Sequence, residues 1–141
     1  MLVRVAVLAD YASLSEMVKL NVMGIFSMII ASRVPCVHPQ MQLVCQIEFD
    51  TDEAGKKDLR ISMIDADGHE LFGIDGEMLV PRDSEGEPTT VSQILCLNNV
   101  RFENYGAYEF RVSIDGGSVA TIPVRVVRPR SRPPVLPVSS N

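Results

Sequence analysis

The chain has 141 residues, of which 46% are hydrophobic and 22% are charged, so it holds enough apolar material for one core and resembles an ordinary folded domain in composition. The net charge is −5, but residues 128–141 carry three arginines and no acids, and subtracting +3 from −5 leaves −8 on residues 1–127. An acidic body argues against a nucleic-acid partner and against docking on an anionic membrane.

Neither a secretory signal nor a membrane-spanning segment is recognisable in the first third of the sequence. Residues 1–11 alternate in character and contain Arg4 and Asp10, unlike the apolar run of a secretory signal. The longest apolar stretch, residues 22–31, is interrupted by Gly24 and Ser27 and is too short for a membrane-spanning helix. Three cysteines, an odd number, favour free thiols in a reducing compartment. We therefore expect a cytoplasmic protein.

The first two expected strands, 2–10 and 19–31, are apolar on both faces. In the first, Leu2, Ala6 and Leu8 share one parity while three valines occupy the other. In the second, Phe26 shares the even positions with other apolar residues, and Ile25 shares the odd positions with Met23 and Ile29. A strand in a sandwich normally buries only one face. A loop, the C-terminal tail or another chain must therefore cover the second face.

The later strands alternate with a period of two. Between 39 and 49, apolar odd positions such as Leu43 and Ile47 alternate with mostly polar even ones, which is typical of a half-buried strand. The stretches 65–68 (DADG) and 115–117 (DGG) are typical of hairpin turns, because Asp-Gly supplies the positive φ angles that tight hairpins need. Residues 50–58 and 81–88 are polar and are expected to be loops.

These patterns predict an all-β antiparallel β-sandwich of immunoglobulin or C2 type, with a domain over 1–127 and a Pro/Arg-rich tail over 128–141. A glycine shortly before Tyr108, near the start of the penultimate strand, allows the tyrosine hydroxyl to bond backbone at a corner between sheets. The alternative is that Tyr108 is only a core aromatic residue. About eight strands are expected, at 2–10, 19–31, 39–49, 57–65, 69–80, 90–98, 107–114 and 118–127.

Metal sites are not favoured by the sequence. Carboxylates cluster in loops 50–53 and 65–67, but these loops flank one strand and should lie at its opposite ends, so calcium ligands would not converge. Zinc donors are present in Cys36, His38, Cys45 and Cys96, but their spacing matches no standard zinc pattern. All three cysteines have apolar neighbours in sequence and are expected to behave as small core residues. We predict no metal and no cofactor.

Catalysis is also not favoured. Cys36 and His38 are two residues apart and would share a face of an extended chain, which is a weak arrangement for a nucleophile and its base. His69 follows a turn and is expected to be solvated. No glycine-rich loop stands between a strand and a helix, as phosphate binding requires. We therefore predict no enzyme and no catalytic residue.

Several segments together resemble a family of small bacterial proteins. They are 8–12 (LADYA), 19–26 (KLNVMGIF), 37–39 (VHP) and 91–95 (VSQIL). The family is a domain of unknown function of the DUF6941 type, and the resemblance runs from residue 8 to about 127. It implies a bacterial source and a compact β-sandwich, and it carries no catalytic role to any position. The loop 13–18 and the tail after Val127 depart from what we expect in such proteins.

The sequence favours a non-enzymatic interaction or structural module that self-associates through apolar strand faces. The expected interface contains an apolar patch and an arginine-rich tail, which could lie on the acidic loop 81–88 of a neighbour. Two alternatives remain, a β-sandwich that binds a ligand or calcium through its loops and, more remotely, a Cys/His hydrolase. The expected interface residues are Leu8, Met23, Ile25, Ile29, Arg128, Arg130 and Arg132.

Overall fold

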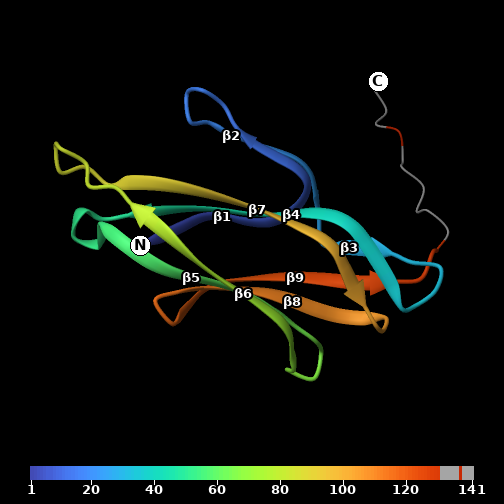
Figure 1. Ribbon diagram of the computed structural model, residues 1–141. Helices are drawn as coiled ribbons and strands as arrows, with labels where there is room; N and C mark the ends of the chain where they lie inside the picture. Colours follow the sequence, from blue (N-terminus) through green and yellow to red (C-terminus); the bar gives the residue numbers. More distant parts are fainter. Residues whose placement is uncertain (131–136, 138–141) are drawn as a thin grey trace.

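The computed structural model describes residues 1–130 and 137, and within them the chain forms two β-sheets that face each other (Figure 1). Sheet A has four strands in the order β2-β1-β4-β7, and sheet B has five in the order β3-β9-β8-β5-β6. The architecture is all-β, mostly antiparallel, open and sandwich-like. The strands are β1 (Leu2–Leu14), β2 (Leu20–Phe26), β3 (Met28–Ile30), β4 (Cys36–Phe49), β5 (Gly55–Ile64), β6 (Glu70–Val80), β7 (Thr89–Phe102), β8 (Gly106–Ile114) and β9 (Gly117–Val127), with one 3-10 helix, η1 (Thr51–Glu53).

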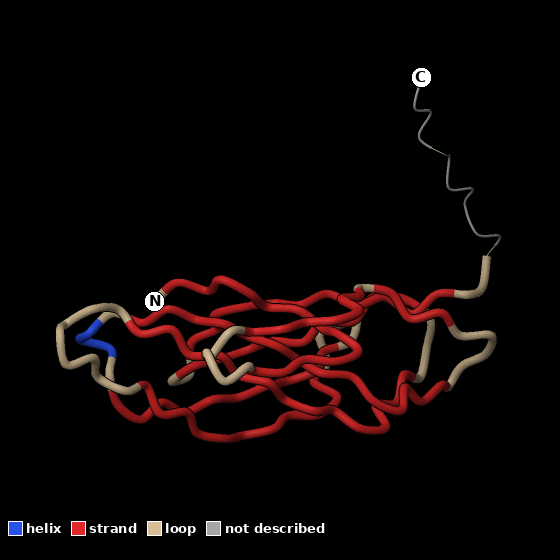
Figure 2. Tube along the Cα trace, turned by 90° about the horizontal axis from the view of Figure 1, so that it is seen from above, coloured by secondary structure: helices blue, strands red, loops and turns tan. Residues whose placement is uncertain are grey.

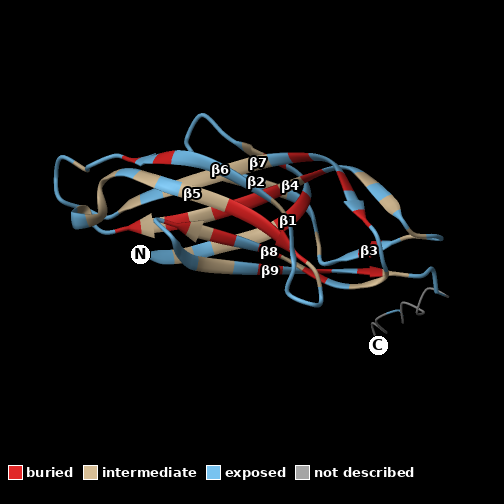
Figure 3. Ribbon diagram, turned by 60° about the horizontal axis from the view of Figure 1, so that its bottom comes forward, coloured by how far each residue is buried: buried red, intermediate tan, exposed pale blue. Residues whose placement is uncertain are grey.

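The period-two pattern places the core between the sheets, as expected. On β4, Met41 to Phe49 at odd positions are buried and face β5 and β8 of the other sheet. Figure 3 shows buried segments along the central strands, exposed loops at both ends, and a β6 that is exposed over most of its length. The body is elongated, with loops at both ends and η1 at one of them (Figure 2). One small void of about 30 Å³ remains between the sheets, next to Leu43 and Ile61.

The expected single strand 19–31 is wrong, because the chain changes sheet at Ser27. The segment before it, β2, pairs antiparallel with β1 in sheet A, while β3 pairs parallel with β9 in sheet B. The crossing is held by a backbone bond of 3.0 Å from the Arg125 N–H to the Ser27 carbonyl. One expected strand thus becomes two, and the described residues contain nine strands in place of about eight.

Strand β1 also differs from the expectation, both in which of its residues point toward the core and in its length. A register shift between Val3 and Val5 places Val3 against the core with Ala6 and Leu8, so Leu2 points outward and is 54% exposed. Such a bulge inserts one residue into a strand and reverses the parity beyond it. The strand continues to Leu14, well past its last pair with β4 at Ala9.

The structure confirms a core aromatic ring and a backbone-bonded hydroxyl at the corner, the two roles that the sequence left open for Tyr108. Its hydroxyl donates to the Asn104 carbonyl at 2.8 Å and accepts from the Asn104 N–H at 3.0 Å. The bonds pin the short connection by which the chain passes from β7 in sheet A to β8 in sheet B. The hairpin at 115–117 is confirmed as well, since Asp115 and Gly116 both have positive φ angles, of 50° and 82°.

Candidate interaction surface

Two residues of the expected apolar patch do not reach the surface. Leu8 is fully buried, because it pairs with Phe26 on one side and Leu43 on the other and faces the core with them. Ile29 is 8% exposed, because the change of sheet at Ser27 turns it into the core beside β9. Their expected exposure is wrong, and neither can contact another chain.

The other two, Met23 and Ile25, are 65% and 62% exposed and belong to a larger apolar feature. Residues 10–26, the end of β1, the turn and β2, form a hairpin that pairs with no third strand, and we call it the arm. In Figure 1 its turn stands above sheet A, on the side away from sheet B. Fourteen large hydrophobic side chains are exposed among the described residues, and six of them are in the arm: Tyr11, Leu14, Met17, Val18, Met23 and Ile25.

The arm is held at its base by one side-chain hydrogen bond and by a close approach of its own two strands. The amide oxygen of Gln42 accepts a hydrogen bond of 2.8 Å from the Ala12 N–H, which ties the arm to β4. Gly24 has a φ of 69°, a conformation that favours glycine, and it passes close to the Asp10 side chain on the neighbouring strand. The arm is therefore a defined projection and not a loose loop.

Beneath the arm, the outward side of sheet A carries no charged side chain over most of its described length. Residues paired across a sheet share a face, so the rows Val5–Gln46–Ser92, Val7–Val44–Ile94 and Ala9–Gln42–Cys96 all point away from the core. The first charges appear at one end, in the Arg4–Glu48 ion pair. We call the following set the uncharged face: Val5, Val7, Ala9, Gln40, Gln42, Val44, Gln46, Ser92, Ile94, Cys96 and Asn98.

The uncharged face has a small buried layer of its own. Val44 and Ala9 are fully buried, yet neither belongs to the core cluster between the sheets. Neighbouring side chains on the outward side must therefore cover them. A second apolar layer on the outside of a sheet is unusual where that side meets only water.

The outward side of sheet B shows the opposite character. There Arg60 bridges Glu70 and Asp75, each at 2.8 Å, and Lys56 pairs with Glu77 at 3.0 Å. Arg111 pairs with Glu109 at 2.7 Å on the next strand. The outward side of sheet B therefore presents solvated charges, while the outward side of sheet A presents apolar and amide groups. Charge depletion is the compositional mark of an interface centre.

The sequence predicted only part of this surface. The segment 13–18 carries an apolar signal in Leu14, Met17 and Val18, but the expected loop there does not predict that β1 extends to Leu14 and that all three are exposed in the arm. The even positions of β4 hold three glutamines and a valine between residues 40 and 46 and no charge, which pointed to the uncharged face. The sequence did not show that β7 adds Ser92, Ile94 and Asn98 to it.

The arginines of the expected interface lie elsewhere. Arg128 is exposed, and its guanidinium carbon stands 4.8 Å from the centroid of the Tyr105 ring, a cation–π contact just after β9 ends. The Tyr105 hydroxyl donates to the Ala31 carbonyl at 2.9 Å, so this contact has a fixed base. Arg130 is exposed. Arg132 lies outside the described residues.

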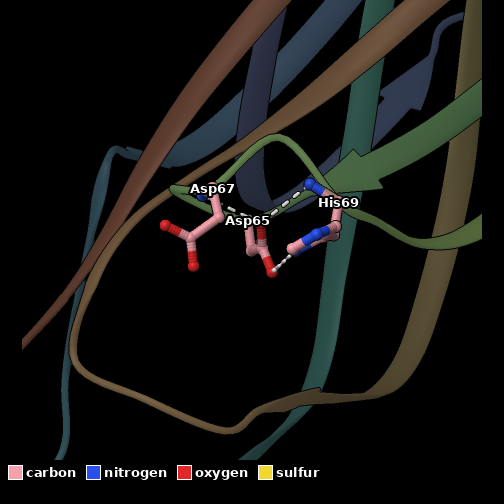
Figure 4. Close-up of side chains that lie close together, drawn as sticks. All are labelled: Asp65, Asp67 and His69. Atoms are coloured by element: carbon pink, nitrogen blue, oxygen red, sulfur yellow. Dashed lines mark hydrogen bonds and ion pairs between the residues drawn. The ribbon is translucent and has the colours of Figure 1, made fainter.

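The two acidic loops lie at opposite ends of β5, as expected, and each uses its own carboxylates. Figure 4 shows Asp65, Asp67 and His69 gathered in the β5–β6 turn. The Asp65 carboxylate accepts from the backbone N–H of His69 at 2.9 Å and of Asp67 at 3.0 Å, and these bonds, the first above all, lower the pKa of Asp65. This is turn chemistry.

The other loop is similar. Glu53 accepts from the Met1 amino group at 2.8 Å and from the Asp50 N–H at 2.9 Å. Both hydrogen bonds lower the pKa of Glu53, and the bond from the Met1 amino group has the larger effect. Asp50 and Asp52 are exposed beside it. Each group is local to one turn, and neither draws a ligand from a second element.

The cysteines differ in exposure. Cys45 is in the core, and burial raises the pKa of its thiol to about 11. Cys36 is half-buried, and Cys96 is exposed on the uncharged face, where Gln40 donates to its sulfur at 3.2 Å. The expectation that all three behave as core residues is therefore wrong for Cys96, because the even positions of β7 near it point outward. Among described residues, no metal-binding group includes a cysteine.

Cys36 and His38 line one open hollow together with residues 29–33 and Pro35, next to the chain crossing. The His38 ring stacks at a tilt on Phe26, with centroids 5.6 Å apart. No hydrogen bond within the described part of the chain joins the Cys36 sulfur to His38 or orients the imidazole from behind. The arrangement lacks the linked nucleophile, base and orienting group that catalysis needs.

One family model matches residues 4–127, and its description is a family of unknown function (DUF6941). No curated protein matches the sequence. No helix in the described residues is long and apolar enough to cross a membrane.

Proposed function

Because the chain belongs to the DUF6941 family, whose function is unknown, its role has to be argued from its surface, and we propose that it is a non-enzymatic interaction module that self-associates through the arm and the uncharged face. The observation that carries the proposal is the arm, whose six large hydrophobic side chains are 44–79% exposed. A concentration of exposed apolar side chains on one projection is typical of an interaction site.

The chemistry of the arm supports a protein partner. Met17 and Met23 are flexible and polarisable, and Tyr11 combines an apolar ring with a polar hydroxyl, which are the residue types enriched at interface centres. The neighbouring uncharged face adds apolar and amide groups without a charge to desolvate. No pocket of this surface gathers the linked acid, base or metal-binding groups that an enzyme uses, within the residues described.

A pair of matched variants tests the proposal. Met23→Glu places a charge in the middle of the arm, and Leu79→Glu places one on β6, where Leu79 is 71% exposed on the other sheet. We expect wild type and L79E to have the same assembled mass by light scattering after size exclusion, and M23E to fall to the 15.5 kDa of one chain. Equal masses for M23E and L79E would contradict the proposal, provided that both keep the circular dichroism of the wild type.

A second part of the proposal concerns the tail. The arginine-rich residues after Val127 complement the acidic loop at 81–88, which carries Asp83, Glu85 and Glu87. One chain's tail could lie on a neighbour's loop and add a contact that salt weakens. The full chain should then associate more tightly than a chain ending at Val127 at low salt, and this advantage should shrink as salt is added. Identical salt dependence of the two would remove this part and leave the arm untouched.

The finer fold assignment is a proposal as well, namely an immunoglobulin-type sandwich. It is supported by the neighbour order β9-β8-β5, which matches the G-F-C order of that fold, and by the hydroxyl-to-backbone bonds of Tyr108 near the start of β8. An experimental structure whose strands superpose on the immunoglobulin order would support it, and a different strand order would overturn it.

A further inference from the structure

The position of the arm relative to the uncharged face decides how two copies can meet. Both features lie on the side of sheet A that points away from sheet B, and the arm rises from the edge of the face itself (Figure 1). Any second copy that covers the face must therefore also meet the arm. Two flat faces cannot simply stack, because an arm stands between them.

The arm has apolar side chains on both of its sides. Paired residues share a side, so Tyr11 lies with Met23, while Leu14 lies with Leu20 on the other side. Tyr11 and Met23 are 52% and 65% exposed, and Leu14 is 44% exposed. An isolated two-stranded ribbon is only marginally stable in water, so covering its two apolar sides stabilises it. The arm's own sheet can cover one of them at most.

Charge favours a second copy as the partner that covers the other side. The body carries −8 on residues 1–127, so two copies repel each other over most of their surfaces. The uncharged face is the large strand surface on which two copies can approach without bringing like charges together. Its glutamine and asparagine side chains both donate and accept hydrogen bonds, so they can pair with their own kind.

The available area agrees with a stable contact. The six exposed side chains of the arm lie on both of its sides, so one opposing face covers part of them, and the receiving face supplies the rest of the roughly 800 Å² that each partner buries in a standard interface. Ile94 and Val7 are half-buried there and offer an apolar floor on either side of Val44.

From these observations we propose that the chain forms a closed, two-fold dimer in which the arm of each copy lies on the uncharged face of the other. This inference rests on the proposed function and names its partner, a second copy, and its contact, Met23 of one arm against the Ile94 region of the opposite face. Since arm and face lie on the same side of the molecule, one two-fold rotation makes both contacts together. The assembly then closes at two chains.

Two single variants that complement each other test the arrangement. Met23→Lys puts a positive charge on the arm, and Ile94→Glu puts a negative charge on the face. Each variant alone has two damaged contacts per dimer and should run as a monomer. A mixture of the two can form a heterodimer with one wild-type contact and one Lys–Glu contact. We expect mass twice that of one chain to return on mixing, as measured by light scattering. Ser92→Glu is the second face variant, in case Ile94→Glu does not fold.

The outcomes separate this arrangement from the proposed function. If M23K is monomeric, but both I94E and S92E stay dimeric, the arm mediates self-association without touching the opposite face, and the arrangement is wrong while the proposed function stands. Monomeric singles that stay monomeric on mixing also overturn it. Growth to larger species with rising concentration contradicts the closed form. A wild-type chain that is monomeric at all concentrations overturns both.

Discussion

The side chain of Gln42 reaches across the edge of the β1–β4 pairing and accepts the Ala12 N–H at 2.8 Å. Gln42 lies on the uncharged face, and Ala12 lies in the arm, three residues beyond the last β1–β4 pair. This bond connects the two features that the proposed dimer uses. A fixed arm loses less conformational freedom on binding than a mobile one, which favours association.

Gln42→Ala should therefore weaken assembly by more than the loss of one amide from the uncharged face would. We expect the free energy of unfolding of the body to fall by about 1 kcal/mol, the usual contribution of one hydrogen bond. We also expect the dimer to dissociate at a higher protein concentration than the wild type does. Hydrogen exchange at residues 11–14 should be faster. The matched control is Gln46→Ala, on the same face, whose amide bonds Ser92 at 3.2 Å and does not touch the arm. Equal exchange of the arm in both variants would contradict the role of Gln42.

Tyr108→Phe should destabilise the body by about 1–3 kcal/mol, because the substitution leaves both the N–H and the carbonyl of Asn104 without their partner in a partly buried corner. The ring still packs on Phe102, with centroids 5.0 Å apart, so packing loss is small. Denaturant unfolding measures the difference. Tyr105→Phe, which loses one bond to Ala31, should cost less, and a larger loss there than at Tyr108 would be inconsistent with the corner as the stronger restraint.

Because the Cys45 thiol is buried, we predict that the free energy of unfolding falls at alkaline pH. Burial raises the pKa of its thiol to about 11, above the value near 9 of an exposed cysteine, so the folded state keeps the proton more strongly than the unfolded chain. The stabilising difference is complete below pH 9 and is lost as the pH rises toward 11. Relative to Cys45→Val, the wild type should lose roughly 2–3 kcal/mol over that range. Parallel pH profiles for the two proteins would show that Cys45 is not buried.

Cys96 reports on the dimer contact directly. It is exposed in one chain and lies on the uncharged face, so a second copy should cover it, while Cys36 is half-buried near the chain crossing and serves as an internal reference. We expect maleimide labelling of Cys96 to slow as protein concentration rises, with little change at Cys36. Labelling of Cys96 that is independent of concentration, in a chain that is dimeric, would place the interface elsewhere.

The sequence was sufficient where one face of a strand is buried, and insufficient where the chain leaves its sheet. The alternation from Met41 to Phe49 and the Asp-Gly turns follow from local chemistry, and the structure confirms them. The run around Ser27 is apolar on both parities, so its period does not reveal that β3 crosses to sheet B. For that reason the burial of Ile29 could not be predicted.

Part of the candidate surface could be predicted from the sequence and part could not. Met23 and Ile25 stood out because a second apolar parity needs a cover, and both are exposed. Leu8 follows the same local pattern and is in the core, because the bulge between Val3 and Val5 resets which residues of β1 face inward. The uncharged face is assembled from β1, β4 and β7, and only strand order and register bring these residues together.

The most direct test is the mass of the unmodified chain in solution, measured by light scattering across a hundredfold range of concentration at moderate salt. The account predicts twice the 15.5 kDa of one chain at the upper end, with dissociation to one chain on dilution and no larger species. A mass of 15.5 kDa at every concentration would mean that the arm and the uncharged face meet no second copy, and the central claim would be wrong.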